Sequence, residues 1–376
     1  MNIEVDIIPN DQQEDENDLQ RNIAYKDAVV VNSDWTIETI SLQINKGRID
    51  LEPGFQRRNA WDPQRKSRLI ESIIVGMPVP NIVLAENKSH SGRFIVIDGK
   101  QRLLAISEFM KDEYKLKGLD IRYDLNDKKF SDLSQDDREY LENATLRSTL
   151  IRNWSDNNFL FALFFRLNSG SLPLSPQELR RALIGGNLLD AIDTYLTSSQ
   201  PFKDIFGEKL DRRMRDSELV LRFIAFDSDL EGYQGDFKDF LDKTTKHFES
   251  NWHIKQGDLQ LIFQKLDVAL SVTRKVFGDD AFKKWVDKKY ERVINRAIFD
   301  AVARFFSDPA VATAAIGKEI QIAEALQDLC LTQEFKDAIE KTPKTKSATY
   351  NRINLWGSAL ANCVSMHYAP NIFRIV

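Results

Sequence analysis

The segment VIDGKQRLLAISEF places five polar or flexible residues between an apolar run and a helix-like pattern. Asp98 and Gly99 suffice to turn the chain. Three residues exceed what the turn requires: Lys100, Gln101 and Arg102. Backbone N–H groups at a helix start, an ammonium and a bidentate guanidinium together suit a polyphosphate. Asp98 would then hold Mg²⁺, directly or through water. The alternative is that Asp98 caps the helix and pairs with Arg102.

A second candidate anion site lies upstream, in WDPQRKSRLIESIIVGMPVP. Asp62 followed by Pro63 is a typical helix start, and Gly76 with Pro78 marks the end. Three polar side chains share one face at spacings of three and four residues: Arg65, Arg68 and Ser72. Backbone N–H groups and the helix dipole favour an anion there. We expect the two helix starts to converge on one triphosphate. The alternative is a solvated charged flank.

The elements around these motifs predict a tail and two domains. Acidic residues crowd the start, so we expect residues 1–28 to be a flexible tail. Over 29–154 a helix-like segment, DWTIETISLQINKG, precedes strand-like segments NIVLAEN, RFIVID, KLKGLDIRYDL and TLRSTLIRN. Over 155–376 amphipathic runs such as SPQELRRALIGGNLLDAIDTYL follow one another. The predicted fold class is α+β, with an α/β domain followed by a mostly helical one.

Composition narrows the possible functions. The chain has 376 residues and a formal net charge of −5, and without the tail it is close to neutral, which neither indicates nor excludes DNA binding. Two cysteines without CxxC spacing and four scattered histidines argue against a disulfide framework or a zinc site. The start lacks a signal-peptide pattern, and the longest apolar stretch, FLFALFFRL, is too short for a membrane span. We therefore expect a cytoplasmic protein.

The stretch FQRRNAWDPQRKSRLIESIIVGMPVPNIVL, followed by VIDGKQRLLAI, resembles the N-terminal domain of GmrSD-type restriction proteins. This family is named for its DGQQR motif and belongs to the ParB/sulfiredoxin superfamily. The resemblance continues through FFRLNSGSLPLSPQELRRAL, RRMRDSELVLRFIAF and INRAIFDAV, so it covers most of the chain. It implies a ParB/sulfiredoxin-like domain that binds and usually hydrolyses a nucleoside triphosphate, in defence against foreign or modified DNA.

The resemblance also implies site residues. DGKQR aligns with the family motif, except that Lys100 replaces the first glutamine. The added positive charge should preserve phosphate binding, but the motif loses an amide that could orient the attacking water. The implied catalytic residues are Asp98, Gln101 and Arg102. The implied nucleotide-binding residues are Gln56, Arg57, Arg65, Arg68, Ser72, Gly99, Lys100, Gln101 and Arg102.

Two further features of the resemblance concern the first half of the chain. Phe55, Gln56 and Arg57 match a segment that approaches the same pocket in relatives, although an aromatic-anchored turn is the alternative. The sulfiredoxin branch has a helix similar to DPQRKSRLIESI that contacts nucleotide phosphates. Its reactive cysteine has no counterpart in GKQR, so we do not expect sulfinic-acid repair.

The second half offers weaker candidates. Ser175, Pro176 and Glu178 form a capping box. The densest basic cluster contains Lys209, Arg212, Arg213, Arg215 and Arg222. It either follows a DNA backbone or pairs with Asp211, Asp216 and Glu218, and we favour pairing. Asn168 either reaches the nucleotide or closes a turn. His367 begins HYAP, which resembles the start of an HNH-like nuclease domain, but too little chain follows, and we expect His367 to be a packing residue.

Together these features predict a regulator or sensor of a DNA restriction or anti-phage defence system. It would bind and hydrolyse a nucleoside triphosphate with Mg²⁺, and a separate nuclease or effector subunit would cleave DNA. Contact with DNA and self-association stay open. The alternatives are a nucleotide- or DNA-binding module without turnover, and a ParB-like metal-dependent DNase that uses Asp98.

Overall fold

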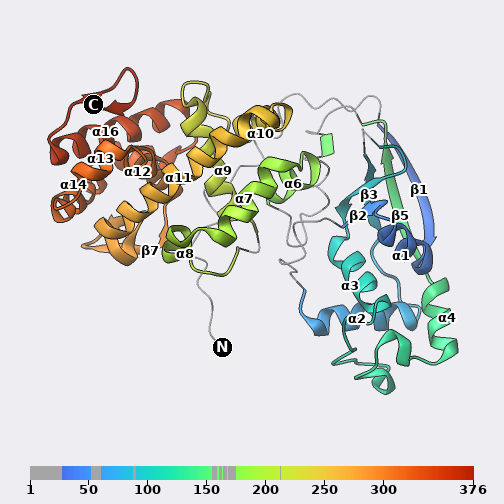
Figure 1. Cartoon of the computed structure of the whole chain (residues 1–376). Coiled ribbons are helices and arrows are strands. Elements are labelled where there is room, and N and C mark those ends of the chain that lie inside the picture. Colours follow the sequence, from blue (N-terminus) through green and yellow to red (C-terminus); the bar gives the residue numbers. More distant parts are fainter. Residues whose placement is uncertain are drawn as a thin grey trace. The chain divides into compact units, whose positions relative to one another are not determined.

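The computed structural model describes residues 28–51, 61–87, 90–154, 159–160, 163, 167, 175–211 and 213–376. The chain divides into two compact units, one within Leu19–Leu174 and the other formed by Ser175–Val376. The first contains a small mixed sheet with helices, and the second is mostly helical (Figure 1). The predicted fold class is therefore confirmed. Of the predicted acidic tail, only Ala28 lies within the described residues.

The α/β unit is built on one five-stranded sheet in the order β1-β5-β3-β4-β2. The strands are β1 (Val29–Thr36), β2 (Ile49–Asp50), β3 (Ile82–Glu86), β4 (Phe94–Asp98) and β5 (Thr145–Arg152). β5 runs antiparallel to β1 and parallel to β3, while β4 runs antiparallel to β3 and parallel to β2. The sheet is thus mixed, which brings both strand ends and strand starts to each of its edges.

Four α-helices of the described residues accompany this sheet: α1 (Ile37–Asn45), α2 (Pro63–Ile74), α3 (Lys100–Met110) and α4 (Gln135–Asn143). Their apolar faces enter one core, in which Ile40, Ile70 and Ile106 are fully buried together with Leu84 of β3. Burial of these faces is the main favourable term for the unit.

The boundaries of α2 agree with the sequence signals. The Asp62 side chain accepts a hydrogen bond from the Arg65 N–H at 2.8 Å, and Pro63 occupies the first turn. The helix ends before Gly76, whose φ of +74° lies in the left-handed region.

Two predicted elements of the α/β unit are wrong. DWTIETISLQINKG begins as a strand, and its helix starts only at Ile37, because the Thr36 hydroxyl accepts the Thr39 N–H at 3.1 Å and caps it. KLKGLDIRYDL is not a strand but a series of turns with a short 3₁₀ helix at Tyr123–Leu125. Three consecutive backbone N–H groups of this segment bond to one side chain rather than to a neighbouring strand.

That side chain is the Glu71 carboxylate on α2, which is 4% exposed. It accepts hydrogen bonds from the backbone N–H groups of Asp120 at 3.1 Å and of Ile121 and Arg122 at 2.7 Å each. Burial alone would raise the pKa of Glu71, but the three N–H donors outweigh it and hold the pKa below its ordinary value. The carboxylate thus fixes the segment between α3 and α4.

We expect Glu71→Gln to lower the free energy of unfolding by about 2–3 kcal/mol, because an amide cannot accept all three N–H groups. Since the folded pKa lies below the ordinary value of 4.5, this contribution is present above pH 4.5 and is lost as pH falls through the folded pKa. Urea unfolding at neutral pH and in acid should therefore show a difference from the parent that narrows in acid. Glu139→Gln, at an exposed position, is the control. A difference independent of pH would contradict the role of the charge.

The helical unit contains eleven α-helices within its described residues: α6 (Pro176–Leu183), α7 (Asn187–Ser198), α8 (Gln200–Phe206), α9 (Arg215–Asp229), α10 (Phe237–Ser250), α11 (Trp252–Phe277), α12 (Arg296–Phe306), α13 (Pro309–Ala314), α14 (Glu319–Leu331), α15 (Gln333–Lys336) and α16 (Lys346–Val364). Two hairpins add β6 (Lys283–Val286) with β7 (Lys289–Ile294), and β8 (Tyr368–Ala369) with β9 (Arg374–Ile375). Among the described residues, no helix is long and apolar enough to cross a membrane.

The start of this unit confirms the predicted capping box. The Ser175 hydroxyl accepts the Glu178 N–H, and the Glu178 carboxylate accepts the Ser175 N–H. The amphipathic run SPQELRRALIGGNLLDAIDTYL forms two helices. Gly185 and Gly186, at φ +59° and +96°, separate α6 from α7.

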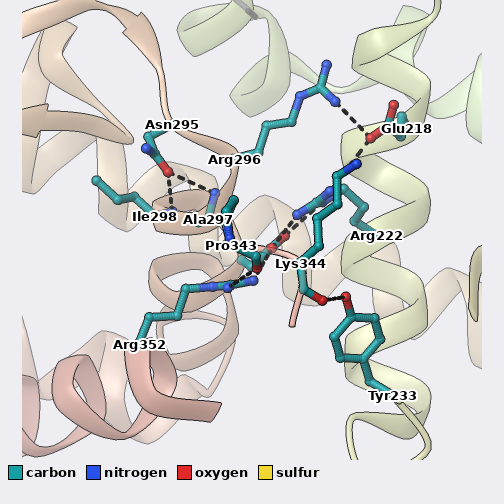
Figure 2. A network of polar contacts seen from close by, with 11 residues as sticks. Glu218, Arg222, Tyr233, Asn295, Arg296, Ala297, Ile298, Pro343, Lys344 and Arg352 are labelled. Atoms are coloured by element: carbon teal, nitrogen blue, oxygen red, sulfur yellow. Dashed lines mark hydrogen bonds and ion pairs between the residues drawn. The ribbon is translucent and has the colours of Figure 1, made fainter. Parts of the chain in front are cut away.

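A buried ionic network connects α9, α12 and α16 (Figure 2). Arg296 donates to Glu218 at 2.9 Å. Asp300 accepts hydrogen bonds from Arg222 at 3.1 and 2.5 Å and from Arg352 at 3.1 Å. All five side chains are at most 5% exposed. Three guanidinium groups therefore share two carboxylates in the interior of the unit.

Candidate functional site

The DGKQR segment forms a tight turn from strand to helix. Asp98 is the last residue of β4, and α3 begins at Lys100. Between them Gly99 has a φ of +94°, and a Cβ there would lie 2.6 Å from Ile82 Cγ2, so glycine is required. Among the described residues, no side chain caps this end of α3. The helix dipole and the uncapped first turn favour an external anion.

Arg102 is held in place at this turn. Its Nη2 donates to Asp98 Oδ2 at 2.7 Å and to the backbone oxygen of Asn81 at 3.3 Å. The Arg102 side chain is 12% exposed and that of Asp98 28%. The predicted pairing of Asp98 with Arg102 is therefore present, whereas the predicted capping by Asp98 is not.

Two polar atoms at the turn are buried without a hydrogen-bond partner within the described part of the chain: Gln101 Oε1 and Arg102 Nε. Buried polar atoms in native proteins are nearly always paired, with protein or with water. The described part of the chain thus leaves one acceptor and one donor beside the helix start unsatisfied.

The turn lies at a sheet edge where four strands begin or end. Val83 faces Asp98, Ile82 faces Ser148, and Asp34 faces Arg147. The end of β4, the starts of β3 and β5 and the end of β1 therefore share this edge.

A cavity of about 800 Å³ opens at the same edge, lined by residues of α2, α4, β1 and β5 and by the segment after α2. Its charged lining consists of Asp34, Asp136, Glu139 and Arg147. Arg147 is already 3.4 Å from Asp34. Three carboxylates against one paired cation disfavour a polyphosphate, so the cavity is a poorer phosphate site than the turn.

The predicted arginine face of α2 is engaged locally. The Arg65 guanidinium lies 4.9 Å from the centre of the Trp61 ring, and Arg68 pairs with Asp120 at 3.0 Å. The Ser72 hydroxyl donates to the backbone oxygen of Arg68 at 2.8 Å. Arg65 and Arg68 are exposed, as the alternative of a charged flank describes.

The predicted convergence of the two helix starts is wrong. In the first turns of α2, Lys66 pairs with Glu108 and Ser67 accepts the Lys117 N–H. Glu108 is eight residues along α3 from Lys100, about 12 Å of helix. The start of α2 thus lies beside the end of α3, because the two apolar faces pack with the helices in that direction.

Asp98 is the only predicted metal ligand. Within the described ranges no group of three or more His, Cys, Asp or Glu side chains could hold a metal ion, and Asp98 Oδ1 has no hydrogen-bond partner there. A single carboxylate oxygen fits Mg²⁺ that is coordinated mainly by phosphate oxygens and water.

The favoured interpretation of the basic cluster is confirmed for two arginines. Arg215 is 3% exposed and pairs with Asp211 at 2.5 Å, and Arg222 is 3.7 Å from Glu218. Buried side chains cannot follow a DNA backbone, so that alternative is wrong for both. The sequence did not indicate Asp300, because it lies 78 residues after Arg222.

Five predicted residues lie outside the described residues: Phe55, Gln56, Arg57, Asn168 and Arg212. The prediction that His367 packs is wrong, because its side chain is exposed while the next residue, Tyr368, is buried. Neighbouring side chains of a β-hairpin point to opposite faces, and Tyr368 takes the inner one.

Comparison with known families matches residues 37–185 to the domain described as GmrSD restriction endonuclease, N-terminal domain. This range contains the DGKQR turn, the first helix of the second unit and every strand of the five-stranded sheet except β1. No curated protein and no solved structure matches the chain. Residues 37–185 thus carry a domain that matches the GmrSD restriction endonuclease N-terminal domain, as the DGKQR segment predicted.

Proposed function

We propose that this chain is a cytoplasmic regulator or sensor subunit of a DNA restriction or anti-phage defence system, and that it binds and hydrolyses a nucleoside triphosphate. The GmrSD domain indicates a protein of such a system. The observation that carries the nucleotide proposal is the turn at Asp98–Arg102. There an uncapped helix start, a positioned guanidinium and two unsatisfied polar atoms lie together.

The chemistry would use charge and position rather than a covalent intermediate. The first turn of α3 would receive the terminal phosphates, with Arg102 donating through its guanidinium and Lys100 adding positive charge. Asp98 Oδ1 would hold Mg²⁺, which supplies charge neutralisation when bound. This combination accelerates phosphoryl transfer by positioning and electrostatic stabilisation.

A separate nuclease or effector subunit would cleave DNA in this proposal. Two observations support it. Within the described residues no cluster of metal-binding side chains is present, and two of the five residues of the basic cluster, Arg215 and Arg222, are buried in ion pairs. The two rivals are a binding module without turnover and a DNase that uses Asp98.

We expect Asp98→Asn to abolish hydrolysis and to retain measurable triphosphate affinity, because the amide still accepts the Arg102 hydrogen bond but no longer attracts a cation. Phosphate release and binding are measured with each triphosphate, with and without Mg²⁺ and DNA. Asp34→Asn is the matched control, an exposed carboxylate at the same sheet edge, and should change neither quantity.

The same assays separate the rivals. Triphosphate binding without phosphate release by the parent protein, even with DNA, favours the binding module. Metal-dependent nicking of plasmid DNA that disappears in Asp98→Asn favours the DNase.

A further inference from the structure

The longest helix of the chain, α11, carries an apolar stripe that no part of the described chain covers. Ile254, Leu261 and Val268 are 64%, 59% and 36% exposed. The opposite face of the helix enters the core of the helical unit. Single exposed apolar residues need no explanation, but a seven-residue repeat across the outer face is typical of a helix that packs on a second helix.

A glycine beside this stripe is a second, independent observation. Gly257 lies inside a 26-residue helix with an ordinary helical φ, where glycine is less favourable than alanine. A Cβ at Gly257 would meet nothing within 4 Å. No contact within the described chain therefore requires glycine here. A residue without a side chain lets another backbone or side chain approach closely.

The charges beside the stripe are complementary to each other. At about 100° per residue, Asp258 and Lys265 lie on one flank of the stripe and Gly257 on the other. If a second α11 packs antiparallel on the first, Asp258 of each helix faces Lys265 of the other, and Val268 of each faces Gly257. In a parallel pair each flank would face the opposite flank of the partner, so Asp258 and Lys265 would face the Gly257 side and could not pair with each other. The charges therefore favour an antiparallel, two-fold symmetric pair.

We propose that α11 is a homodimer interface at which two copies of this chain pair antiparallel through the Ile254–Leu261–Val268 stripe. In one chain, Asp258 contacts Lys255 and Lys265 contacts Asp227, each at 3.0 Å. The acidic and basic side chains stay at the surface, 55% and 46% exposed, so each gains a second partner in the dimer. This proposal does not depend on nucleotide binding at the DGKQR turn.

The test is the mass of the full chain in solution, measured by light scattering and sedimentation over a range of concentrations. We expect a monomer–dimer equilibrium whose Kd rises about 100-fold or more in Leu261→Glu, since this change acts twice in a symmetric interface. Ile320→Glu on α14 is the control, because Ile320 is 75% exposed outside the stripe. A parent protein that is monomeric throughout, or a dimer unaffected by Leu261→Glu, would overturn the proposal.

Two further variants separate pairing from a change in folding. Gly257→Ala should raise the melting temperature and yet weaken the dimer, because alanine favours the helix but occupies the space facing Val268. Asp258→Lys should weaken the dimer, and adding Lys265→Asp should restore it. Failure of the double variant to recover would exclude the antiparallel arrangement.

Discussion

Replacing Asp300 with asparagine is expected to lower the free energy of unfolding by about 3–5 kcal/mol, because the change leaves two buried guanidinium groups without their shared carboxylate. Asp300 is fully buried and accepts hydrogen bonds from both Arg222 and Arg352. Asparagine has nearly the same volume, so no cavity forms and the loss reports the missing charge and the missing hydrogen-bond acceptor.

The measurement is urea unfolding at neutral pH, with Asp239→Asn as control. Asp239 also pairs with a cation, Lys243 at 2.6 Å, but these side chains are 56% and 74% exposed. An exposed pair of this kind contributes about 0.5 kcal/mol or less. Adding Arg352→Met to Asp300→Asn should recover part of the loss, because it removes one uncompensated charge. A loss below about 1 kcal/mol for Asp300→Asn would contradict an ionic role.

The network also connects distant parts of the helical unit. Arg352 on α16 donates to Asp300 on α12 and, at 2.6 Å, to the backbone oxygen of Pro343. The Tyr233 hydroxyl donates to the backbone oxygen of Lys344 (Figure 2). The segment before α16 is therefore fixed by groups that are more than a hundred residues apart along the chain.

Features set by neighbouring residues could be predicted from the sequence. The start of α2 depends on Asp62 and Pro63, the capping box of α6 on Ser175 and Glu178, and the turn before α3 on Gly99. In each of them the cause lies within about four residues of its effect, because capping and turn geometry are local. The family resemblance rested on the same short segments.

Features set by distant contacts could not be predicted. The run KLKGLDIRYDL has strand-like alternation, but three of its backbone N–H groups donate to the Glu71 carboxylate, which lies 49 to 51 residues earlier in the chain. The face of α2 does carry arginines, yet the helix packs with its start beside Glu108. Periodicity identifies which face of a helix is polar, but not the direction in which the helix lies on its neighbour.

Within the candidate site, the pairing of Asp98 with Arg102 was one of two alternatives left open by the sequence, and it is present because residues four apart at a helix start are within reach of each other. The sequence did not indicate Asn81, whose backbone oxygen also accepts a hydrogen bond from Arg102. That contact depends on the pairing of β3 with β4. It fixes the guanidinium, which would reduce the entropic cost of binding a phosphate at the proposed site.

Replacing Arg102 with alanine is expected to weaken triphosphate binding by about 100-fold or more, since it removes a guanidinium able to form two charge-assisted hydrogen bonds with phosphate. Arg102→Lys keeps the charge but loses the planar fork, so its affinity should be intermediate. Arg147→Ala is the matched control, an arginine at the same sheet edge that is 70% exposed and lines the acidic cavity.

Calorimetric titration with each triphosphate gives the affinities, and thermal unfolding without ligand shows whether the variants stay folded. Although Arg102 is 12% exposed, its partner Asp98 is 28% exposed and keeps contact with water, so we expect only a small loss of stability in the absence of Arg102. If Arg102→Ala binds as tightly as the parent while Arg147→Ala does not, the nucleotide site is the cavity beside β5 rather than the turn. If Arg102→Ala weakens triphosphate binding and Arg147→Ala does not, Lys100→Gln then tests the role of the lysine in the DGKQR motif. Faster hydrolysis in that variant would show that the lysine holds phosphate at the expense of orienting the attacking water.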